Sequence, residues 1–352
     1  MPKRKASDIM GCGASAEGAY LKAAPNGAAG GDCQASARGT PVMFDGHIHL
    51  WPDADWVPGA VPQKGLEMAA TFAEFHEKAT RAGVVGALVV THNFKWVKCD
   101  AKDGTDHSYL CEAIQAFPNF FRGIGMVSPL VGVDSVESVL QRFCDLGFVG
   151  VRINLRDHWE RDGQGPMADV ARATFAIAGK LGMVVGLYGM VYDAVHLSAM
   201  HELLALAPGT TVVIDHFGCF REAGKSDDAH EHAFLSLLDF AKYPKVHMKV
   251  SGWKRVSSVL GGARMSLRTD VVRCVERVVA AFTSKRTLWG SDAPLALLDG
   301  GMPPGHAAYQ ATIGTTYDEV CCDTDILLTA STLSAEERAD LYYGTAKSLF
   351  RM

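Results

Sequence analysis

The chain has 352 residues, of which 48% are hydrophobic and 21% are charged, and its formal net charge is −5. This composition allows a substantial core and excludes a chain that is disordered throughout. No long basic block follows Lys3-Arg4-Lys5 and no apolar run is long enough for a bilayer, so we expect neither a nucleic-acid nor a membrane partner. The nine cysteines include no C-x-x-C pair, which favours a reducing, cytoplasmic location.

Residues 1–40 are rich in Gly, Ala and Ser and show no sustained helical or strand period. We predict a disordered extension there, followed by a single domain over residues 41–352. A role of this extension in organelle targeting stays open, although Asp8, Glu17 and Asp32 are unusual for a transit peptide.

From Val42 onward, short apolar runs alternate with longer amphipathic stretches. This alternation predicts an α/β fold with a parallel sheet, and a count of eight strands favours a closed (β/α)₈ (TIM) barrel over an open sheet. No Gly-rich phosphate loop follows the first strand, which also argues against the open sheet. The predicted strands are 42–49, 84–91, 121–127, 149–154, 183–188, 211–216, 246–251 and 287–291. The predicted helices include 71–81, 135–146, 193–206 and 270–282.

Two insertions, residues 50–70 and 294–333, follow the first and the last predicted strands. Enzymes with a (β/α)₈ barrel build their active sites from loops at the carboxyl ends of the strands. We therefore expect the insertions to form a lid or rim over an active site.

Histidine and aspartate residues stand at the ends of three predicted strands. The first strand ends in DGHIHL, and the strand period of two places His47 and His49 on one face. The sixth strand carries His216 to the same end, and the eighth ends at Asp292, beside the first strand in a closed barrel. Three imidazoles and a carboxylate can hold a divalent metal or polarise a carbonyl without one. Surface or core histidines and a helix N-cap at Asp292 are the alternative interpretations.

Cationic and polar side chains near other strand ends suggest an anionic substrate. Arg152, Asn154 and Arg156 share one face of the fourth strand, and Arg255 follows the seventh. A guanidinium matches a carboxylate through two parallel hydrogen bonds, although a salt bridge at the rim would explain the same pattern. Tyr188 ends the fifth strand and either donates to a substrate carbonyl or packs against its neighbours.

Taken together, these motifs resemble the amidohydrolase superfamily, specifically the amidohydrolase-2 group of lactonases and decarboxylases. The group includes lactonases acting on 2-pyrone-4,6-dicarboxylate and on sugar lactones, and the resemblance covers about residues 42–351. It implies a hydrolase whose catalytic centre is formed by His47, His49, His216 and Asp292. The matching elements are DGHIHL, GVRIN, DHFG, KVSG and WGSDAP at strands one, four, six, seven and eight, and LYYGTAKSLF near the C-terminus.

This chain lacks some metal-binding residues of the family, and their absence narrows the expected reaction. Metal-dependent members add a histidine at the end of the fifth strand, where this chain has Tyr188, and binuclear members add a carboxylated lysine at the fourth. Both ligands are missing, which favours the lactonase branch, whose dicarboxylate lactonase works without metal. Arg255 matches the substrate arginine of that lactonase, whereas Cys219 replaces a basic residue and leaves the exact substrate open.

The leading interpretation is a hydrolase that opens a carboxylate-bearing lactone or related cyclic ester. Asp292 acts as general base, and His47, His49 and His216 polarise the carbonyl. We predict either no metal or one weakly bound divalent ion, zinc first among the candidates, held by these four residues. The substrate is a small carboxylate, and a homo-oligomer is compatible with the sequence. A zinc-dependent decarboxylase or amidohydrolase on the same barrel, and a binding barrel without chemistry, remain as alternatives.

Overall fold

The computed structural model describes eight ranges of residues, which belong to one compact unit spanning residues 35–352. The described ranges are 41–50, 71–91, 107–128, 131–155, 169–223, 226–257, 268–294 and 316–352. The expected disordered extension (1–40), the first insertion beyond Leu50 and Arg156 lie outside these ranges, as does the side chain of Arg255.

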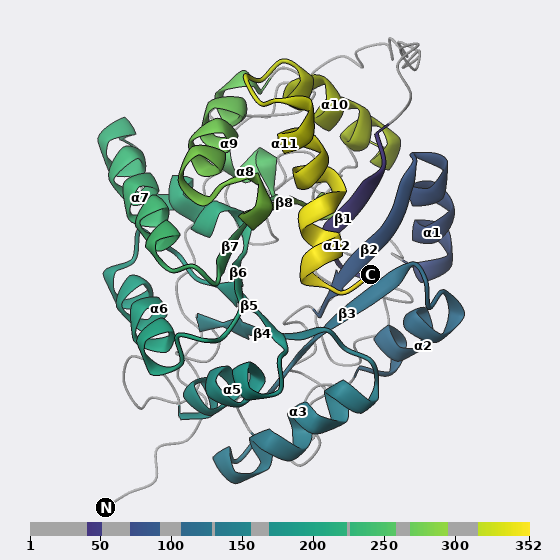
Figure 1. Cartoon of the computed structure of the whole chain (residues 1–352), viewed down its shortest axis with the longest axis vertical. Coiled ribbons are helices and arrows are strands. Elements are labelled where there is room, and N and C mark those ends of the chain that lie inside the picture. Colours follow the sequence, from purple (N-terminus) through teal and green to yellow (C-terminus); the bar gives the residue numbers. More distant parts are fainter. Residues whose placement is uncertain are drawn as a thin grey trace, which may run out of the picture. The chain divides into compact units, whose positions relative to one another are not determined.

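Eight parallel strands form one sheet whose order follows the sequence from β1 to β8. Helices follow the strands and surround them on the outside (Figure 1). The (β/α)₈ barrel predicted from the sequence is therefore confirmed. The strands are β1 (Met43–Ile48), β2 (Val84–Val90), β3 (Phe121–Met126), β4 (Gly150–Asn154), β5 (Val184–Tyr188), β6 (Val212–Ile214), β7 (Val246–Val250) and β8 (Thr287–Trp289).

Backbone hydrogen bonds between the end of β1 and the segment after β8 bring the sheet round into a barrel. His49 N donates to the carbonyl oxygen of Ala293 at 2.8 Å, and Asp292 N donates to that of His47 at 2.9 Å. Ile48 and Ala293 form an isolated parallel bridge at the same place. The segments that carry the candidate site thus also form the seam of the barrel.

The amphipathic stretches predicted from the sequence are helices, and side chains cap several of them. The Thr71 hydroxyl accepts from Glu74 N at 3.2 Å, and the Asp193 carboxylate accepts from Val195 N at 2.9 Å, so each helix begins with one of its free N–H groups satisfied. The helices are α1 (Phe72–Arg81), α2 (Ser108–Ala116), α3 (Val136–Asp145), α5 (Asp169–Lys180), α6 (Ala194–Leu206), α7 (Asp227–Asp239), α8 (Trp253–Val256), α9 (Thr269–Phe282), α10 (Tyr317–Thr329), α11 (Ala335–Ala339) and α12 (Thr345–Leu349). Among the described residues, every helix is too short or too polar to cross a membrane.

The core has two parts, one on each face of the sheet. The larger cluster joins strand residues to the buried faces of the surrounding helices, so it lies outside the barrel wall. Successive side chains of a strand point to opposite faces of the sheet. The smaller cluster contains strand residues that alternate with those of the larger one, so it lies inside the barrel. That inner cluster consists of Phe44, Leu88, Val90, Ile124, Val184, Val213 and Leu288, with Ala346 and Phe350 from the C-terminal segment.

The last insertion only partly matches the expected lid. Residues 316–333, counted as part of that lid, include the helix α10, which packs against α1 and α9 on the outside of the barrel. A capping box between Thr316 and Glu319 begins this helix, and its buried face carries Val320, Leu327 and Leu328. Residues 295–315 lie outside the described ranges, so the lid itself stays a prediction.

Candidate active site

Three histidine side chains and one aspartate meet at the carboxyl ends of the strands. Asp292 Oδ1 lies 3.8 Å from His47 Nε2, 3.6 Å from His49 Nε2 and 3.7 Å from His216 Nε2. The Nε2 atoms of His47 and His49 are 3.2 Å apart. No more than 2% of any of these residues is exposed. The structure thus brings together all four residues predicted for the catalytic centre.

Two of the four residues occupy an unusual backbone conformation. The φ angle is +51° at His216 and +63° at Asp292, in the left-handed region that residues with a side chain rarely adopt. β6 ends at Ile214, earlier than predicted, because the chain then turns through left-handed residues that reach Cys219. Such residues persist only where their surroundings hold them, and they gather at functional sites.

Hydrogen bonds to the far nitrogen fix the orientation of two imidazole rings. His49 Nδ1 donates to the carbonyl oxygen of Val90 at 2.7 Å, because a carbonyl only accepts. His216 Nδ1 lies 2.8 Å from the hydroxyl of Ser251, which follows β7. Both rings therefore direct Nε2 toward Asp292.

A buried network of charges lies behind His47. Lys249 Nζ lies 2.8 Å from Asp215 Oδ1 and 3.0 Å from His47 Nδ1, and Arg152 Nε donates to Asp215 Oδ2 at 3.0 Å. Burial opposes the charged carboxylate, yet the adjacent Lys249 ammonium and Arg152 guanidinium hold the pKa of Asp215 well below its usual range. Burial and the nearby Lys249 ammonium hold the pKa of His47 well below its usual range. These surroundings favour the ionised form of Asp215 and the neutral form of His47.

Sequence reasoning missed Asp215 and Lys249 as members of the site. The pairing joins residues at the ends of β6 and β7, so it depends on how these strands pack. A signal was nevertheless present, because Lys249 is a charged residue between the apolar Met248 and Val250 at the buried end of β7. A lysine buried in this way needs a counter-ion or a task.

The residues predicted to bind substrate are only partly described. Arg152 and Asn154 are 4% and 1% exposed, and both belong to β4. The Arg152 guanidinium carbon lies 5.0 Å from the centroid of the Tyr188 ring, and that ring lies 6.1 Å from the His216 ring. Arg152 and Tyr188 thus stand beside the centre, although Arg152 Nε is already bonded to Asp215. For Arg156 and the side chain of Arg255, the substrate role stays a prediction.

The carboxylate of Asp45 connects β1 to the segment after β8 and to α10 through hydrogen bonds. Its Oδ1 accepts from His47 N at 3.1 Å and from Ser291 N at 2.8 Å, and its Oδ2 accepts from the Tyr317 hydroxyl at 2.8 Å. Burial raises the pKa of Asp45 to about 6, against the opposing effect of these hydrogen bonds. The first residue of α10 is therefore connected to the backbone of the site.

Comparison with known proteins identifies the family. The sequence profile of the family described as Amidohydrolase (Amidohydro_2) matches residues 44–352. The chain belongs to this amidohydrolase family. The resemblance inferred from the motifs is thus confirmed. The L-fucono-1,5-lactonase of Burkholderia multivorans (strain ATCC 17616 / 249) is 29% identical over 143 residues, which are 40% of this chain and 43% of that protein. The match therefore spans less than half of that relative.

Solved structures share the barrel of this amidohydrolase. One is a Pseudomonas putida protein assigned as a 2-pyrone-4,6-dicarboxylic acid hydrolase, with 23% identity and a TM-score of 0.65 over 88% of this chain and 98% of that chain. Another is a zinc-bound amidohydrolase of Burkholderia multivorans, with 18% identity and a TM-score of 0.63 over 88% and 99%. The 5-carboxyvanillate decarboxylase of Sphingomonas paucimobilis has 12% identity and a TM-score of 0.56 over 89% and 99%. At these identities the likeness shows the fold alone.

The donor atoms at the centre of this amidohydrolase fit one divalent metal ion. His47, His216 and Asp292 offer ligand atoms within 4.8 Å of one another, and His49 Nε2 lies 3.2 Å from His47 Nε2. Zinc binds nitrogen and oxygen about 2.0–2.2 Å away, so neighbouring ligands of a tetrahedral site are about 3.3–3.6 Å apart. The separations of 3.6–3.8 Å around Asp292 are close to this spacing and longer than hydrogen bonds.

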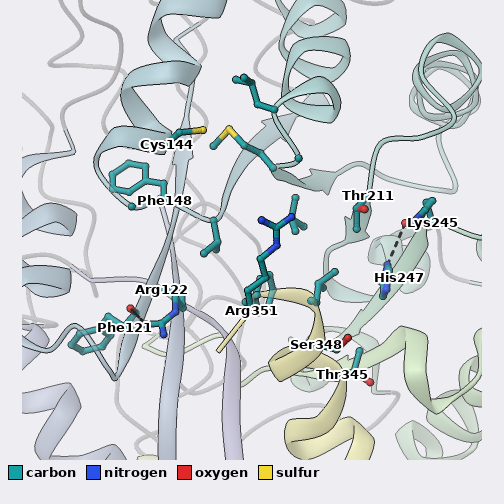
Figure 2. Close-up of a pocket in the computed structure, with 18 of the residues that line it drawn as sticks. Phe121, Arg122, Cys144, Phe148, Thr211, Lys245, His247, Thr345, Ser348 and Arg351 are labelled. Atoms are coloured by element: carbon teal, nitrogen blue, oxygen red, sulfur yellow. Dashed lines mark hydrogen bonds between the residues drawn. The ribbon is translucent and has the colours of Figure 1, made fainter.

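A cavity of about 830 Å³ lies at the other end of the amidohydrolase barrel (Figure 2). Its lining includes Val149, Met183, Thr211 and Lys245, which stand just before strands β4 to β7. Arg351 near the C-terminus also lines it, and the four central residues do not. Because barrel enzymes place their chemistry at the carboxyl ends of strands, this cavity is separate from the candidate active site.

Proposed function

We propose that this amidohydrolase opens a carboxylate-bearing lactone, or a related cyclic ester, through attack of water on the ring carbonyl. The observation that carries the proposal is the convergence of His47, His49 and His216 on the carboxylate of Asp292. The names of two similar proteins, L-fucono-1,5-lactonase and 2-pyrone-4,6-dicarboxylic acid hydrolase, support a cyclic ester as substrate. Family, site geometry and relatives thus favour the same reaction class.

Asp292 is the general base of the proposed reaction. It takes a proton from water while the water oxygen bonds to the carbonyl carbon and the carbonyl π electrons move to the oxygen. The tetrahedral intermediate then collapses, the ring C–O bond breaks, and Asp292 returns the proton to the leaving oxygen. The product is a hydroxy acid, and no further co-reactant is required.

The three histidines stabilise the negative charge that develops on the carbonyl oxygen. Donors held in place before the reaction act strongly because they need no reorganisation, and Ser251 holds the ring of His216. His49 gives its Nδ1 proton to the carbonyl of Val90, so its Nε2 donates to the oxygen only when the ring is an imidazolium. When a divalent ion is bound by the four central residues, it supplies a Lewis acid for the carbonyl and lowers the pKa of bound water.

Positive charge beside the centre supports an anionic substrate. Lys249 and Arg152 carry two positive charges, which the carboxylates of Asp215 and Asp292 balance. The planar guanidinium of Arg152 carries several N–H groups, and we assign it to a substrate carboxylate because this fork matches a carboxylate through parallel hydrogen bonds. The proposed substrate-binding residues are Arg152, Asn154, Arg156, Tyr188 and Arg255.

The variant Asp292→Asn tests the general base. It preserves the shape of the side chain but removes its ability to take a proton. We expect ring opening to slow on the order of 10²–10⁴-fold, with lactone binding retained. Asp134→Asn, at an exposed position, is the matched control and should keep full turnover. Full activity of Asp292→Asn would remove this residue from the mechanism.

A substrate panel tests the reaction class. It contains carboxylate-bearing lactones, uncharged sugar lactones, cyclic amides and aromatic carboxylic acids, with ring opening and CO₂ release measured separately. We expect turnover of the carboxylate-bearing lactones. A preference for uncharged lactones would contradict the assignment of an anionic substrate.

Zinc-dependent decarboxylation is the second candidate function. Two observations favour it: the donor set fits zinc, and a decarboxylase shares the fold. Tyr188 stands where metal-dependent members of the family carry a fifth-strand histidine, which counts against it. CO₂ release from the aromatic acids, without ring opening of any lactone, would establish this function instead.

A further inference from the structure

We propose that the cavity at the amino ends of the strands is a second binding site, whose ligand is a small organic anion with an apolar body and more than one negative charge. A phosphate ester and a dicarboxylate both have this chemistry. The cavity is lined by none of the four central residues, so the proposal is independent of the proposed function.

The size and the apolar lining of the cavity suit a small organic molecule. Its volume is about 830 Å³, and small-molecule sites commonly have about 300–1,000 Å³. Phe148 and Met183 belong to the larger core cluster and Phe350 to the smaller one, and all three line the cavity. Because the core holds these side chains in place, they offer a preformed surface to the apolar body of a ligand.

Four cationic side chains line the same cavity, and none of the described residues in its lining is an aspartate or a glutamate. The whole chain has 39 acidic and 34 basic residues, so the cavity departs from the overall charge balance. A cleft lined by charges of one sign attracts ligands of the opposite sign. The four cations are Arg122, Lys245, Lys285 and Arg351.

The four cations have no carboxylate partner within the described part of the chain. Other cations do, because Arg172, Lys242 and Arg277 each form an ion pair with an acidic residue. Nη1 of Arg122 donates to the carbonyl oxygens of Pro118 and Phe121 at 2.7 and 3.0 Å. These bonds orient the guanidinium and leave its charge without a counter-ion, so an oxyanion in the cavity would supply one.

Positive charge reaches the cavity from separate segments of the chain. Arg122 belongs to β3 and Arg351 follows α12, whereas Lys245 and Lys285 stand just before β7 and β8. In the view of Figure 2, Arg351 lies between Arg122 and Lys245. A Cβ at Gly182 would lie 3.5 Å from Arg351 Nη2, so this guanidinium reaches from the C-terminal segment to the turn before β5. A ligand thus meets cations from several segments, which favours more than one negative charge.

The surroundings of His247, another lining residue, agree with this excess of positive charge. Burial lowers the pKa of its imidazole, and the charges of Arg286 and Lys245 lower it further, against two hydrogen bonds to the backbone. The neutral form of this histidine is therefore favoured, and the positive charge of the lining comes from the four cations.

The first test locates the ligand by NMR of the full-length protein, labelled with carbon-13 at the methionine methyl groups. Met183 lines the cavity, whereas Met126 ends β3 at the end of the barrel that carries the candidate active site. Met183→Leu and Met126→Leu assign the two signals. We expect naphthyl phosphate and phthalate to shift the Met183 signal saturably, and the tighter of the two identifies the preferred anionic group. Shifts confined to Met126, or no saturable shift with either anion, would overturn the proposal.

The second test removes positive charge from the cavity. The triple variant Lys245→Gln/Lys285→Gln/Arg351→Gln changes three exposed side chains, so we expect it to fold. It should bind naphthyl phosphate on the order of 10–100-fold more weakly than wild type in isothermal titration calorimetry, because three charge interactions are lost. Lys78→Gln, at an exposed position of α1 outside the lining, is the matched control and should leave the affinity unchanged.

Uncharged naphthol separates the contribution of charge from that of the apolar lining. We expect naphthol to bind the wild type more weakly than naphthyl phosphate does. Equal affinities of these two compounds for the wild type, or equal affinities of the triple variant and the wild type for naphthyl phosphate, would overturn the proposal. Neither test uses a lactone, so a failure here is distinct from a failure of the proposed function.

Discussion

Replacing Asp215 with alanine would leave two buried cations without their shared counter-ion. The carboxylate is 1% exposed and accepts from Lys249 Nζ at 2.8 Å and from Arg152 Nε at 3.0 Å. Removing one partner of a buried ion pair destabilises a protein by about 3–5 kcal/mol, because an uncompensated charge remains away from water. We therefore expect Asp215→Ala to lower the free energy of unfolding by about 3–5 kcal/mol.

Urea unfolding followed by circular dichroism measures this loss, and the chain offers a matched ion pair on its surface. Glu231 and Arg277 form two hydrogen bonds of 2.7 and 2.8 Å, yet their side chains are 51% and 41% exposed. Exposed pairs contribute about 0–1 kcal/mol, so Glu231→Ala should have a small effect. Equal losses in the two variants, or a loss below about 1 kcal/mol for Asp215→Ala, would refute the reasoning.

Three further predictions concern the metal, the seam and a helix cap. Protein purified without added metal should contain less than one equivalent of zinc and keep its turnover in a chelator; stoichiometric zinc and chelator-sensitive turnover restored by zinc alone would contradict this. A Cβ at Gly290 would lie 2.8 Å from His47 N, so Gly290→Ala should lower the unfolding free energy by about 1–3 kcal/mol, unlike Gly209→Ala, which has open space. Ser334→Ala removes an acceptor for Glu337 N at 3.2 Å and should lower that free energy by about 1 kcal/mol without changing turnover; a change in turnover would contradict a purely local cap.

The alternation of eight short apolar runs with amphipathic stretches was sufficient to predict the barrel. The second strand was predicted at 84–91 and β2 covers Val84–Val90, because a continuous apolar run bounded by polar residues is a local signal. The end of the sixth strand was less accurate. It was predicted to include His216, but β6 ends at Ile214 because the following residues adopt left-handed conformations. Local propensity disfavours this turn, so only the packed structure explains it.

The candidate site was predictable where its residues stand at strand ends. His47 and His49 stand at the end of the first strand and Asp292 follows the last, and these ends must meet in a closed barrel, so sequence order alone places them together. The charge pairing of Lys249 with Asp215 was not predictable in this way, because it depends on side-chain directions within the barrel. The same limit applies to Tyr317, whose hydroxyl reaches Asp45 from a segment that the sequence suggested as lid.

At the seam between β1 and the segment after β8, backbone atoms close the barrel and side chains form the candidate active site. Closure depends on backbone groups, because Asp292 N bonds to the His47 carbonyl and His49 N to the Ala293 carbonyl. These bonds use no side-chain atom of His47, His49 or Asp292, so substitution of the side chains removes none of their donors or acceptors. Asp45 differs, because its carboxylate itself joins β1 to the segment after β8. A loss of turnover on changing Asp292 therefore reports on the reaction, whereas a loss on changing Asp45 also reports on the barrel.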